Sequence, residues 1–404
     1  MRRMNNIPTA QQLSDYFTHE RTAAFWARNR HAYGRSVGST RTPFTLVFVE
    51  DWIKWKMSVA DHARYYTDLR FQRDLRTRCG EHTARVVGLP LNPAVNLGST
   101  IFASLFGGEI LYTKHSSPWI RPVIAEPSDV RSLLELTRAD DLLDRGQIKS
   151  WLDGYQLLAD IDPGAELPFF GSYFHGLATL GCMLVGAAEF IFLLTDHPEE
   201  GHLLMQIIGD VAIRFMDAMR EFTGDSATGL ILANDDLGLL SPGLYEEFCL
   251  SPELGLFDHY SNSSFDMRGY HSDSHCDHHF STLRELRLTD INIAPNVSVR
   301  ELRRCFPDSV IHGQIPPLTF RDASVREVIE STIGILEDAG DDPDLVMSIV
   351  GCLNEGTPLE NILSIMWAIE SRKGGDLIET PSDGQVPDGT RRLTKGMPMI
   401  LEVE

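Results

Sequence analysis

The chain has 404 residues, 43% of them hydrophobic, a size that suits one large barrel or two ordinary domains. Its formal net charge of −21 argues against a nucleic-acid partner or an anionic membrane, because both require a basic surface. No apolar run follows the N-terminal arginines, so a secretory signal is not expected, and six scattered cysteines favour a reducing cytoplasm over a disulfide framework.

The chain begins with polar sequence that predicts an N-terminal helical extension over residues 1–42. Phe44–Val49 is then a short and wholly apolar run, which is typical of a strand buried on both faces. Glu50 and Asp51 follow it directly, and a helix is predicted over Val59–Arg78.

Extended apolar runs, each followed by a helical pattern, recur through the rest of the chain. Together with Phe44–Val49 and the weaker run Gly108–Tyr112 they make about eight strand–helix units. This alternation predicts an α/β fold with parallel strands, most simply a (β/α)8 TIM barrel over residues 43–373, followed by a flexible tail over residues 374–404. The remaining runs are Leu167–Gly171, Gly229–Ala233, Phe265–Tyr270, Asp290–Ile293, Val310–Gly313 and Leu345–Gly351.

One helical segment, Leu177–Leu194, approaches the length of a membrane span and has Glu189 as its only charge. Its glycines, the central carboxylate and the lack of flanking cations favour a buried helix of a large soluble protein. In that setting Glu189 would need a polar partner.

The densest group of metal-capable side chains follows the predicted strand that ends at Tyr270. His271 and Asp273 are two residues apart, so at the end of a strand they face the same way and can converge on one metal ion. Cys352, just after the last apolar run, is the best-placed third ligand. The alternative is a solvated loop that binds nothing specific.

Cys276 and His275 form a rival ligand pair in the same segment. They are less favoured because neighbouring residues on a strand point to opposite faces. The other four cysteines, Cys79, Cys182, Cys249 and Cys305, are expected to be buried small hydrophobic residues.

Polar residues follow nearly every predicted strand, and in a barrel of this kind the strand C-termini face one site. Asp235 and Asp236 would orient a substrate or move a proton, because the pKa of a carboxylate in a partly dry site is tunable. They could equally cap the next helix. The catalytic candidates are Tyr173, His175, Asp235 and Asp236, and the substrate-binding candidates are Glu50, Asp51, Gln314 and His275.

The order of four motifs resembles a known family. DDLGLLSPGLYEEF is followed by a strand ending in His-x-Asp, then by HGQIPPLTF, and finally by IVGCLNEGTPLENI. This pattern closely resembles the uroporphyrinogen decarboxylase superfamily from about Phe44 to Ser371, and within it the zinc-dependent corrinoid methyltransferases. The resemblance implies a (β/α)8 barrel with its cavity at the strand C-termini.

In that methyltransferase branch zinc is held by a His-x-Cys pair and a later Cys, and it binds a substrate thiol that takes a methyl group from a corrinoid. His271 matches the histidine and Cys352 the later cysteine, but Asp273 stands where the branch has cysteine. Oxygen is a harder ligand than sulfur, so this set would leave zinc more Lewis acidic. The metal could then polarise a carboxylate or carbonyl, or activate water.

We therefore expect a cytoplasmic, metal-dependent enzyme, with zinc as the metal, that acts on a small molecule, with methyl transfer as the first choice of reaction. A corrinoid carried by a partner protein would be the methyl donor, and a homodimer is allowed for. The first alternative is a lyase or decarboxylase that uses a small carboxylated substrate without metal. The second is a barrel that binds a small molecule or a corrinoid without turnover.

Overall fold

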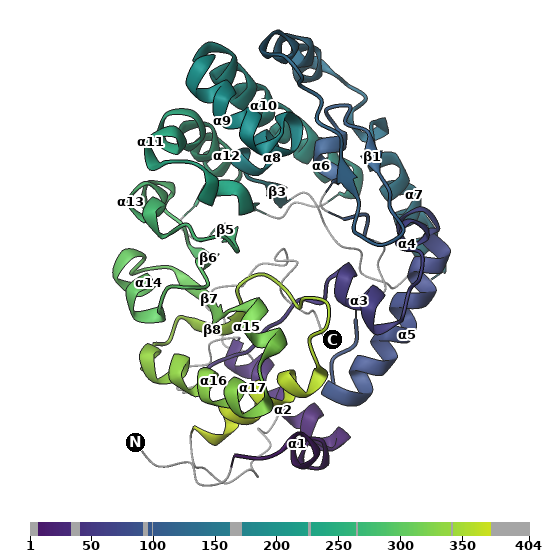
Figure 1. Ribbon diagram of the computed structural model, residues 1–404, viewed down its shortest axis with the longest axis vertical. Coiled ribbons are helices and arrows are strands. Elements are labelled where there is room, and N and C mark those ends of the chain that lie inside the picture. Colours follow the sequence, from purple (N-terminus) through teal and green to yellow (C-terminus); the bar gives the residue numbers. More distant parts are fainter. Residues whose placement is uncertain are drawn as a thin grey trace.

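The computed structural model describes residues 7–33, 41–91, 96–98, 100–161, 172–224, 228–263, 266–340 and 342–372. At its centre lies a six-stranded parallel sheet in which the strands follow one another in chain order. Figure 1 shows the helices arranged around the outside of these strands. The strands are β3 (Tyr173–His175), β4 (Leu230–Ala233), β5 (Arg268–Ser272), β6 (Asp290–Ile293), β7 (Val310–Ile315) and β8 (Leu345–Ile349). The predicted α/β TIM-barrel fold is confirmed.

The apolar run Phe44–Val49 lies beside β8, as a strand of the barrel would. Phe44 and Phe48 form isolated parallel bridges to Met347 and Leu353. A closed barrel would need a further strand between Phe44–Val49 and β3, and the described residues form none there. Gly108–Tyr112 does not fill that place, so its prediction as a barrel strand is wrong: β1 (Ile110–Leu111) pairs antiparallel with β2 (Trp119–Ile120) in a separate small sheet.

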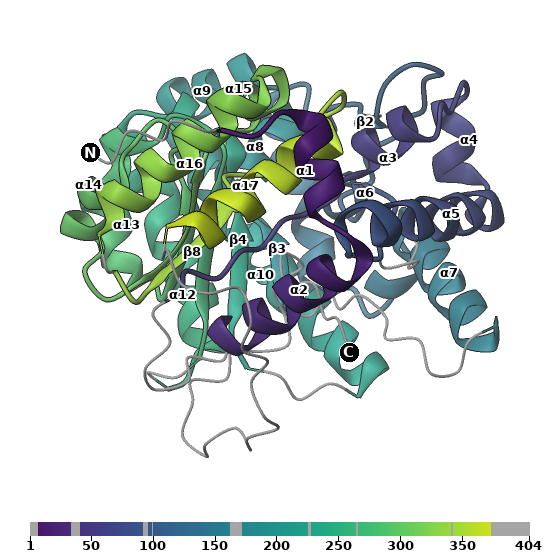
Figure 2. The same ribbon diagram turned by 90° about the horizontal axis from the view of Figure 1, so that it is seen from below.

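The N-terminal helices pack onto the barrel (Figure 2). α1 (Ala10–Tyr16) lies against α17 (Leu359–Ser371), and α2 (His19–Tyr33) lies against α5 (Leu69–Val87). Leu13 and Phe25 are fully buried. Asn29 binds the first barrel run through both ends of its amide, because its Nδ2 donates to Phe44 O at 2.8 Å and its Oδ1 accepts from Phe44 N at 2.7 Å. The N-terminal segment therefore shares the core of the barrel.

The α-helices, in chain order, are α1 (Ala10–Tyr16), α2 (His19–Tyr33), α3 (Glu50–Lys56), α4 (His62–Thr67), α5 (Leu69–Val87), α6 (Ile101–Ser104), α7 (Ile148–Ile161), α8 (Leu177–Val185), α9 (Ala187–Asp196), α10 (Pro198–Thr223), α11 (Pro242–Leu244), α12 (Ser251–Tyr260), α13 (Phe280–Leu283), α14 (Val299–Cys305), α15 (Pro317–Asp322), α16 (Val325–Ala339) and α17 (Leu359–Ser371). Short 3-10 segments are η1 (Pro127–Arg138), η2 (Leu142–Asp144), η3 (Asp235–Leu239), η5 (Asp277–His279) and η6 (Arg284–Leu286), and η4 (Tyr245–Leu250) is a π-helix.

Two predicted helices are broken in the structure. Val59–Arg78 divides into α4 and α5 at Asp68, because the Asp68 side chain accepts a hydrogen bond from Phe71 N and starts a new helix. Leu177–Leu194 divides into α8 and α9 at Gly186, whose φ of +103° is rare for any other residue.

The break at Gly186 changes the setting of Glu189, which lies on the exposed side of α9 and not inside a buried helix. No single described helix is long and apolar enough to cross a membrane. The pair α8 and α9 meets that test jointly by length and composition, with a bend of 104° between the two helices.

Some predicted strand bounds need adjustment. Leu167–Gly171 lies outside the described residues, and β3 begins just after it at Tyr173. Tyr173 and His175 are therefore part of a strand and do not follow one. Glu50 and Asp51 form the first turn of α3 instead of the end of a strand.

Candidate active site

The register of the parallel sheet aligns the predicted site residues at the strand C-termini. His175 in β3 lies opposite Ala233 in β4, Ala233 lies opposite His271 in β5, and His271 lies opposite Asn292 in β6. Asp235 follows β4 after a single residue and opens η3. The residues predicted from scattered parts of the sequence are thereby brought to one end of the barrel.

His271 has different neighbours on its two ring nitrogens. Nδ1 lies 2.8 Å from Oδ1 of Asn292 and 3.1 Å from the Asn292 backbone oxygen. Nε2 lies 3.3 Å from Oδ1 of Asp235. Both atoms near Nδ1 are acceptors, so Nδ1 carries the proton and Nε2 is left to face the carboxylate of Asp235.

Asp235 also contacts the backbone of Asp273. Its Oδ1 accepts a hydrogen bond from the Asp273 backbone N at 3.3 Å. Lost hydration and the charge of Asp235 raise the pKa of Asp273 above its ordinary value, although His271 opposes the shift. The side chains of Asp235, His271 and Asp273 therefore lie close enough to interact electrostatically.

Asp236 differs from its neighbour. Its backbone N donates to Thr179 Oγ1 at 3.0 Å, and burial together with the charge of Asp235 raises the Asp236 pKa to about 6. A carboxyl group with this pKa can both hold and release a proton near neutral pH.

Tyr173 and His175 stand in β3 with little contact to solvent. Burial lowers the pKa of His175 to about 4, so its imidazole is neutral, and burial raises the pKa of Tyr173. The His175 ring packs edge-on against Phe102. Nδ1 of His175 and Oε1 of Gln314 are buried polar atoms for which the described residues supply no hydrogen-bond partner.

Cys352 follows a tight turn at the end of β8. Gly351 has a φ of +104°, and a Cβ placed on it would lie 3.5 Å from the Asp273 Cβ, so the ends of β5 and β8 touch. Burial and the charge of Asp273 raise the pKa of Cys352 to about 12, which keeps its thiol protonated. Within the described ranges, no three His, Cys, Asp or Glu side chains are already spaced to hold a metal ion.

The rival ligands are placed differently. His275 is exposed, whereas Cys276 is fully buried in the core with its pKa raised to about 12, chiefly by burial. Gln314 in β7 is buried, and its Nε2 donates to Ile293 O at 2.9 Å.

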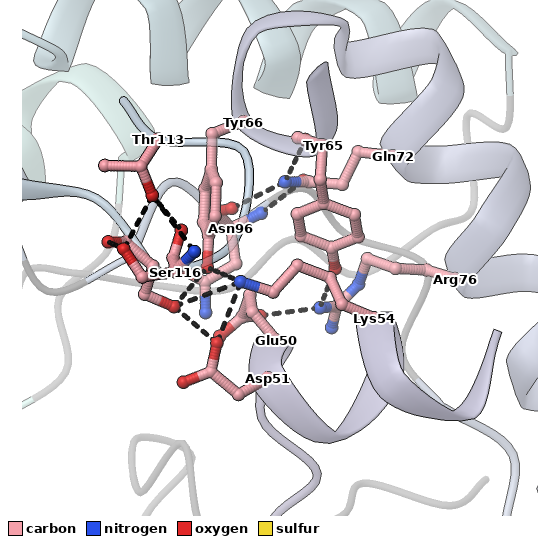
Figure 3. A network of polar contacts seen from close by, with 11 residues as sticks. Glu50, Asp51, Lys54, Tyr65, Tyr66, Gln72, Arg76, Asn96, Thr113 and Ser116 are labelled. Carbon is pink, nitrogen blue, oxygen red and sulfur yellow. Dashed lines mark hydrogen bonds and ion pairs between the residues drawn. The ribbon is translucent and has the colours of Figure 1, made fainter. Parts of the chain in front are cut away.

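Asp51 belongs to a polar network at the edge of the site (Figure 3). Lys54 is fully buried, and its Nζ contacts Asp51 Oδ1 at 2.8 Å, Ser117 Oγ at 3.1 Å and Tyr66 OH at 3.2 Å. Ser117 also donates to Asp51. The network fastens α3 to α4 and to the chain around Ser117, and it leaves the Asp51 side chain 49% exposed.

Glu50, one residue earlier, points into the protein. Its Oε1 lies 2.8 Å from NH1 of Arg76 in α5, and the two side chains are only 11% and 8% exposed. The charges of Glu50 and Asp51 both contribute to the raised pKa of Cys352, so this part of α3 lies within electrostatic range of the site.

A second buried network supports the chain before Asp235, and sequence reasoning missed it. Oε1 of Glu253 accepts from Leu177 N and from Asn234 Nδ2, both at 2.9 Å. Its Oε2 pairs with Tyr245 OH at 2.6 Å and with Tyr270 OH at 3.2 Å. Burial raises the pKa of Glu253 to about 7. The polar Asn234 inside an apolar strand end was the one available signal.

Gly176 makes room for this network, and its replacement is a first test of it. A Cβ on Gly176 would lie 2.3 Å from the Asn234 side chain, so Gly176→Ala must displace Asn234. We expect a loss of about 1–3 kcal/mol in the free energy of unfolding, measured with urea. Gly243→Ala is the control, because nothing lies within 4 Å of its added Cβ. Equal stability of the two variants would contradict this account.

Comparisons with known proteins agree with the architecture. The family model described as uroporphyrinogen decarboxylase (URO-D) matches residues 95–372. No curated protein shows a significant sequence match to the chain. A solved structure of similar fold is a methyltransferase from Methanosarcina mazei, with a TM-score of 0.63 and 17% sequence identity over 88% of this chain and 99% of that chain. The chain thus belongs to the uroporphyrinogen decarboxylase family.

Proposed function

We propose that this chain is a cytoplasmic, metal-dependent enzyme that acts on a small molecule, with zinc as the metal and methyl transfer as the reaction. The observation that carries the proposal is the meeting of three strand ends, at which Asp235 contacts His271 and Asp273 lies against the turn before Cys352. All six cysteines are free thiols, as expected in a reducing compartment.

The chemistry of these side chains suits zinc. His271 is held through Nδ1, which leaves Nε2 as a ligand, and a metal-bound histidine commonly donates its second N–H in this way. Asp273 and Cys352 would be the other two zinc ligands, and Asp235 lies next to His271. A divalent cation would also reduce the repulsion between the Asp235 and Asp273 carboxylates. Zinc bound here would act as a Lewis acid toward a carbonyl, a carboxylate, a thiol or a water molecule.

The remaining residues have roles that follow from their surroundings. Asp236 would move a proton, because its pKa of about 6 lies near neutrality. Tyr173 and neutral His175 would face the substrate, and the unpartnered atoms of His175 and Gln314 would hydrogen-bond to it. Asp51, Glu50 and His275 are further substrate-binding candidates, of which Glu50 is already paired with Arg76.

Methyl transfer is favoured because a methyltransferase shares the fold. The methyl donor would then be a corrinoid carried by a partner protein. A lyase or decarboxylase is the second candidate, and the raised pKa of Asp236 favours it, since such a group can protonate the carbanion that remains after loss of CO2.

Metal content of the purified protein tests the proposal. We expect about one zinc per chain in the wild type, and far less in His271→Ala and in Cys352→Ser, because each change removes a ligand. Cys305→Ser is the matched control, since Cys305 lies on α14 and is a partly exposed free thiol. Stoichiometric zinc in both ligand variants would rule out these ligands, and a metal-free wild type that still released CO2 from a carboxylated substrate would favour the lyase.

A further inference from the structure

Asn292, at the centre of β6, is fully buried and makes four side-chain hydrogen bonds to three other strands or their ends. Its Nδ2 donates to the backbone oxygens of His312 and of Ile349, the latter at 3.1 Å. Its Oδ1 accepts from Gly351 N at 3.0 Å and lies 2.8 Å from Nδ1 of His271. A single amide thus contacts β5, β7 and the turn after β8.

These partners fix the orientation of the amide. Two carbonyl oxygens can only accept, so the group that faces His312 and Ile349 must be the NH2. A backbone N–H can only donate, so the group that faces Gly351 must be the oxygen. His271 Nδ1 faces that same oxygen at 2.8 Å and the Asn292 backbone oxygen at 3.1 Å, so it has to donate, and Nε2 is left facing Oδ1 of Asp235 at 3.3 Å.

We propose that Asn292 is a positioning residue that places the proton of His271 on Nδ1 and ties the turn carrying Cys352 to that histidine. The inference deepens the proposed function and rests on it for its consequence, which is zinc affinity. The geometric part concerns only the tautomer of His271 and the position of Gly351, so it can be tested without any metal.

A purely structural role is the competing explanation, because any buried amide that joins strands stabilises a barrel. Asn361 provides a control for that role. It is 2% exposed, and its Nδ2 donates to Phe320 O at 2.6 Å and to Ala323 O at 3.3 Å, between α17 and α15. Asn361→Ala should therefore destabilise the protein and leave the site unchanged.

The variants Asn292→Ala and Asn292→Asp divide the functions of the side chain. Alanine removes both the acceptor and the donors. Aspartate keeps an oxygen for His271 and Gly351 but cannot donate two hydrogen bonds to carbonyl oxygens when ionised. Aspartate should thus retain the local signals that alanine loses, although both variants lose stability.

Three measurements on the full chain distinguish the positioning role of Asn292 from a purely structural one. Nitrogen-15 NMR of labelled histidine rings, assigned with His271→Ala, should show His271 protonated on Nδ1 and not on Nε2 in the wild type. The Gly351 amide should exchange with solvent at least about tenfold faster in Asn292→Ala than in the wild type, and at nearly the wild-type rate in Asn292→Asp and Asn361→Ala. The zinc dissociation constant should rise about 10–100-fold in Asn292→Ala.

A His271 ring protonated on Nε2 in the wild type would overturn the proposal, and so would unchanged Gly351 exchange in a folded Asn292→Ala. Unchanged zinc affinity despite both local changes would overturn its consequence for the metal. If Asn292→Ala does not fold, the proposal is still tested by the His271 tautomer in the wild type and by the Gly351 exchange rate in Asn292→Asp. If the wild type binds no zinc, the proposed function fails, while the tautomer and the exchange rates still test Asn292 itself.

Discussion

Glu253→Leu is expected to lower the free energy of unfolding by about 3–5 kcal/mol, because it leaves several buried hydrogen-bond donors without an acceptor. These donors are Leu177 N and the Asn234 amide, together with the hydroxyls of Tyr245 and Tyr270. Urea unfolding monitored by circular dichroism measures the effect. A loss below about 1 kcal/mol, the size expected at the protein surface, would show that the network contributes little.

Glu253→Gln should instead remove a dependence of stability on pH. The folded pKa of about 7 lies above the ordinary value of 4.5, so the folded protein favours the protonated acid. This contribution is complete below pH 4.5 and is lost as the pH rises to about 7. Glutamine stays neutral and can still accept from Leu177 N while donating to Tyr245. The variant should therefore match the wild type at pH 4.5 and exceed it at pH 8.

The control for this comparison is Glu330→Gln, at an exposed residue of α16 whose side chain pairs with the equally exposed Arg326. Its stability should follow the wild type at both pH values to within about 0.5 kcal/mol. A constant difference between Glu253→Gln and the wild type from pH 4.5 to pH 8 would mean that Glu253 does not bind its proton more tightly in the folded state.

Arg76→Leu is the second large effect, with an expected loss of about 3–5 kcal/mol, because it leaves the Glu50 carboxyl group buried without its partner. The double variant Glu50→Gln with Arg76→Leu should recover most of this loss, since no unpaired charge then remains. Urea unfolding of the two single variants and the double variant forms the cycle. Additive losses would show that the two side chains are not coupled.

The ion pair of Glu50 is a feature that the sequence did not predict. Two carboxylates directly after an apolar run suggest groups at the rim of a barrel, and Asp51 does remain half exposed. The partner of Glu50, however, is Arg76, which lies on a different helix. Nothing in the local sequence around Glu50 indicates that pairing, because it depends on how α3 packs against α5.

The parallel strands β4, β6, β7 and β8 were predictable because each is short and fully buried. The prediction failed at Gly108–Tyr112, where an apolar run of similar length forms a small antiparallel pair with Trp119–Ile120. It failed again at Gly186, since a glycine inside an apolar segment can either continue a helix or turn the chain sharply.

The candidate site was predictable to the extent that reactive residue types lie at or just after strand ends, as His271 in β5 and Asp273 directly after it do. The supporting residues were not. Asn292 and Glu253 lie inside elements that read as ordinary strand and helix, and their importance comes from hydrogen bonds to atoms far away in the sequence. The order of residue types along the chain does not indicate which of those hydrogen bonds form.

X-ray absorption at the zinc edge of the purified, zinc-loaded protein tests most directly whether His271, Asp273 and Cys352 hold one ion. The account predicts one sulfur neighbour at roughly 2.3 Å and nitrogen or oxygen neighbours at about 2.0–2.1 Å, with the sulfur signal lost in Cys352→Ser and kept in Cys305→Ser. A shell of nitrogen and oxygen alone in the wild type, or a sulfur signal that survives in Cys352→Ser, would contradict it.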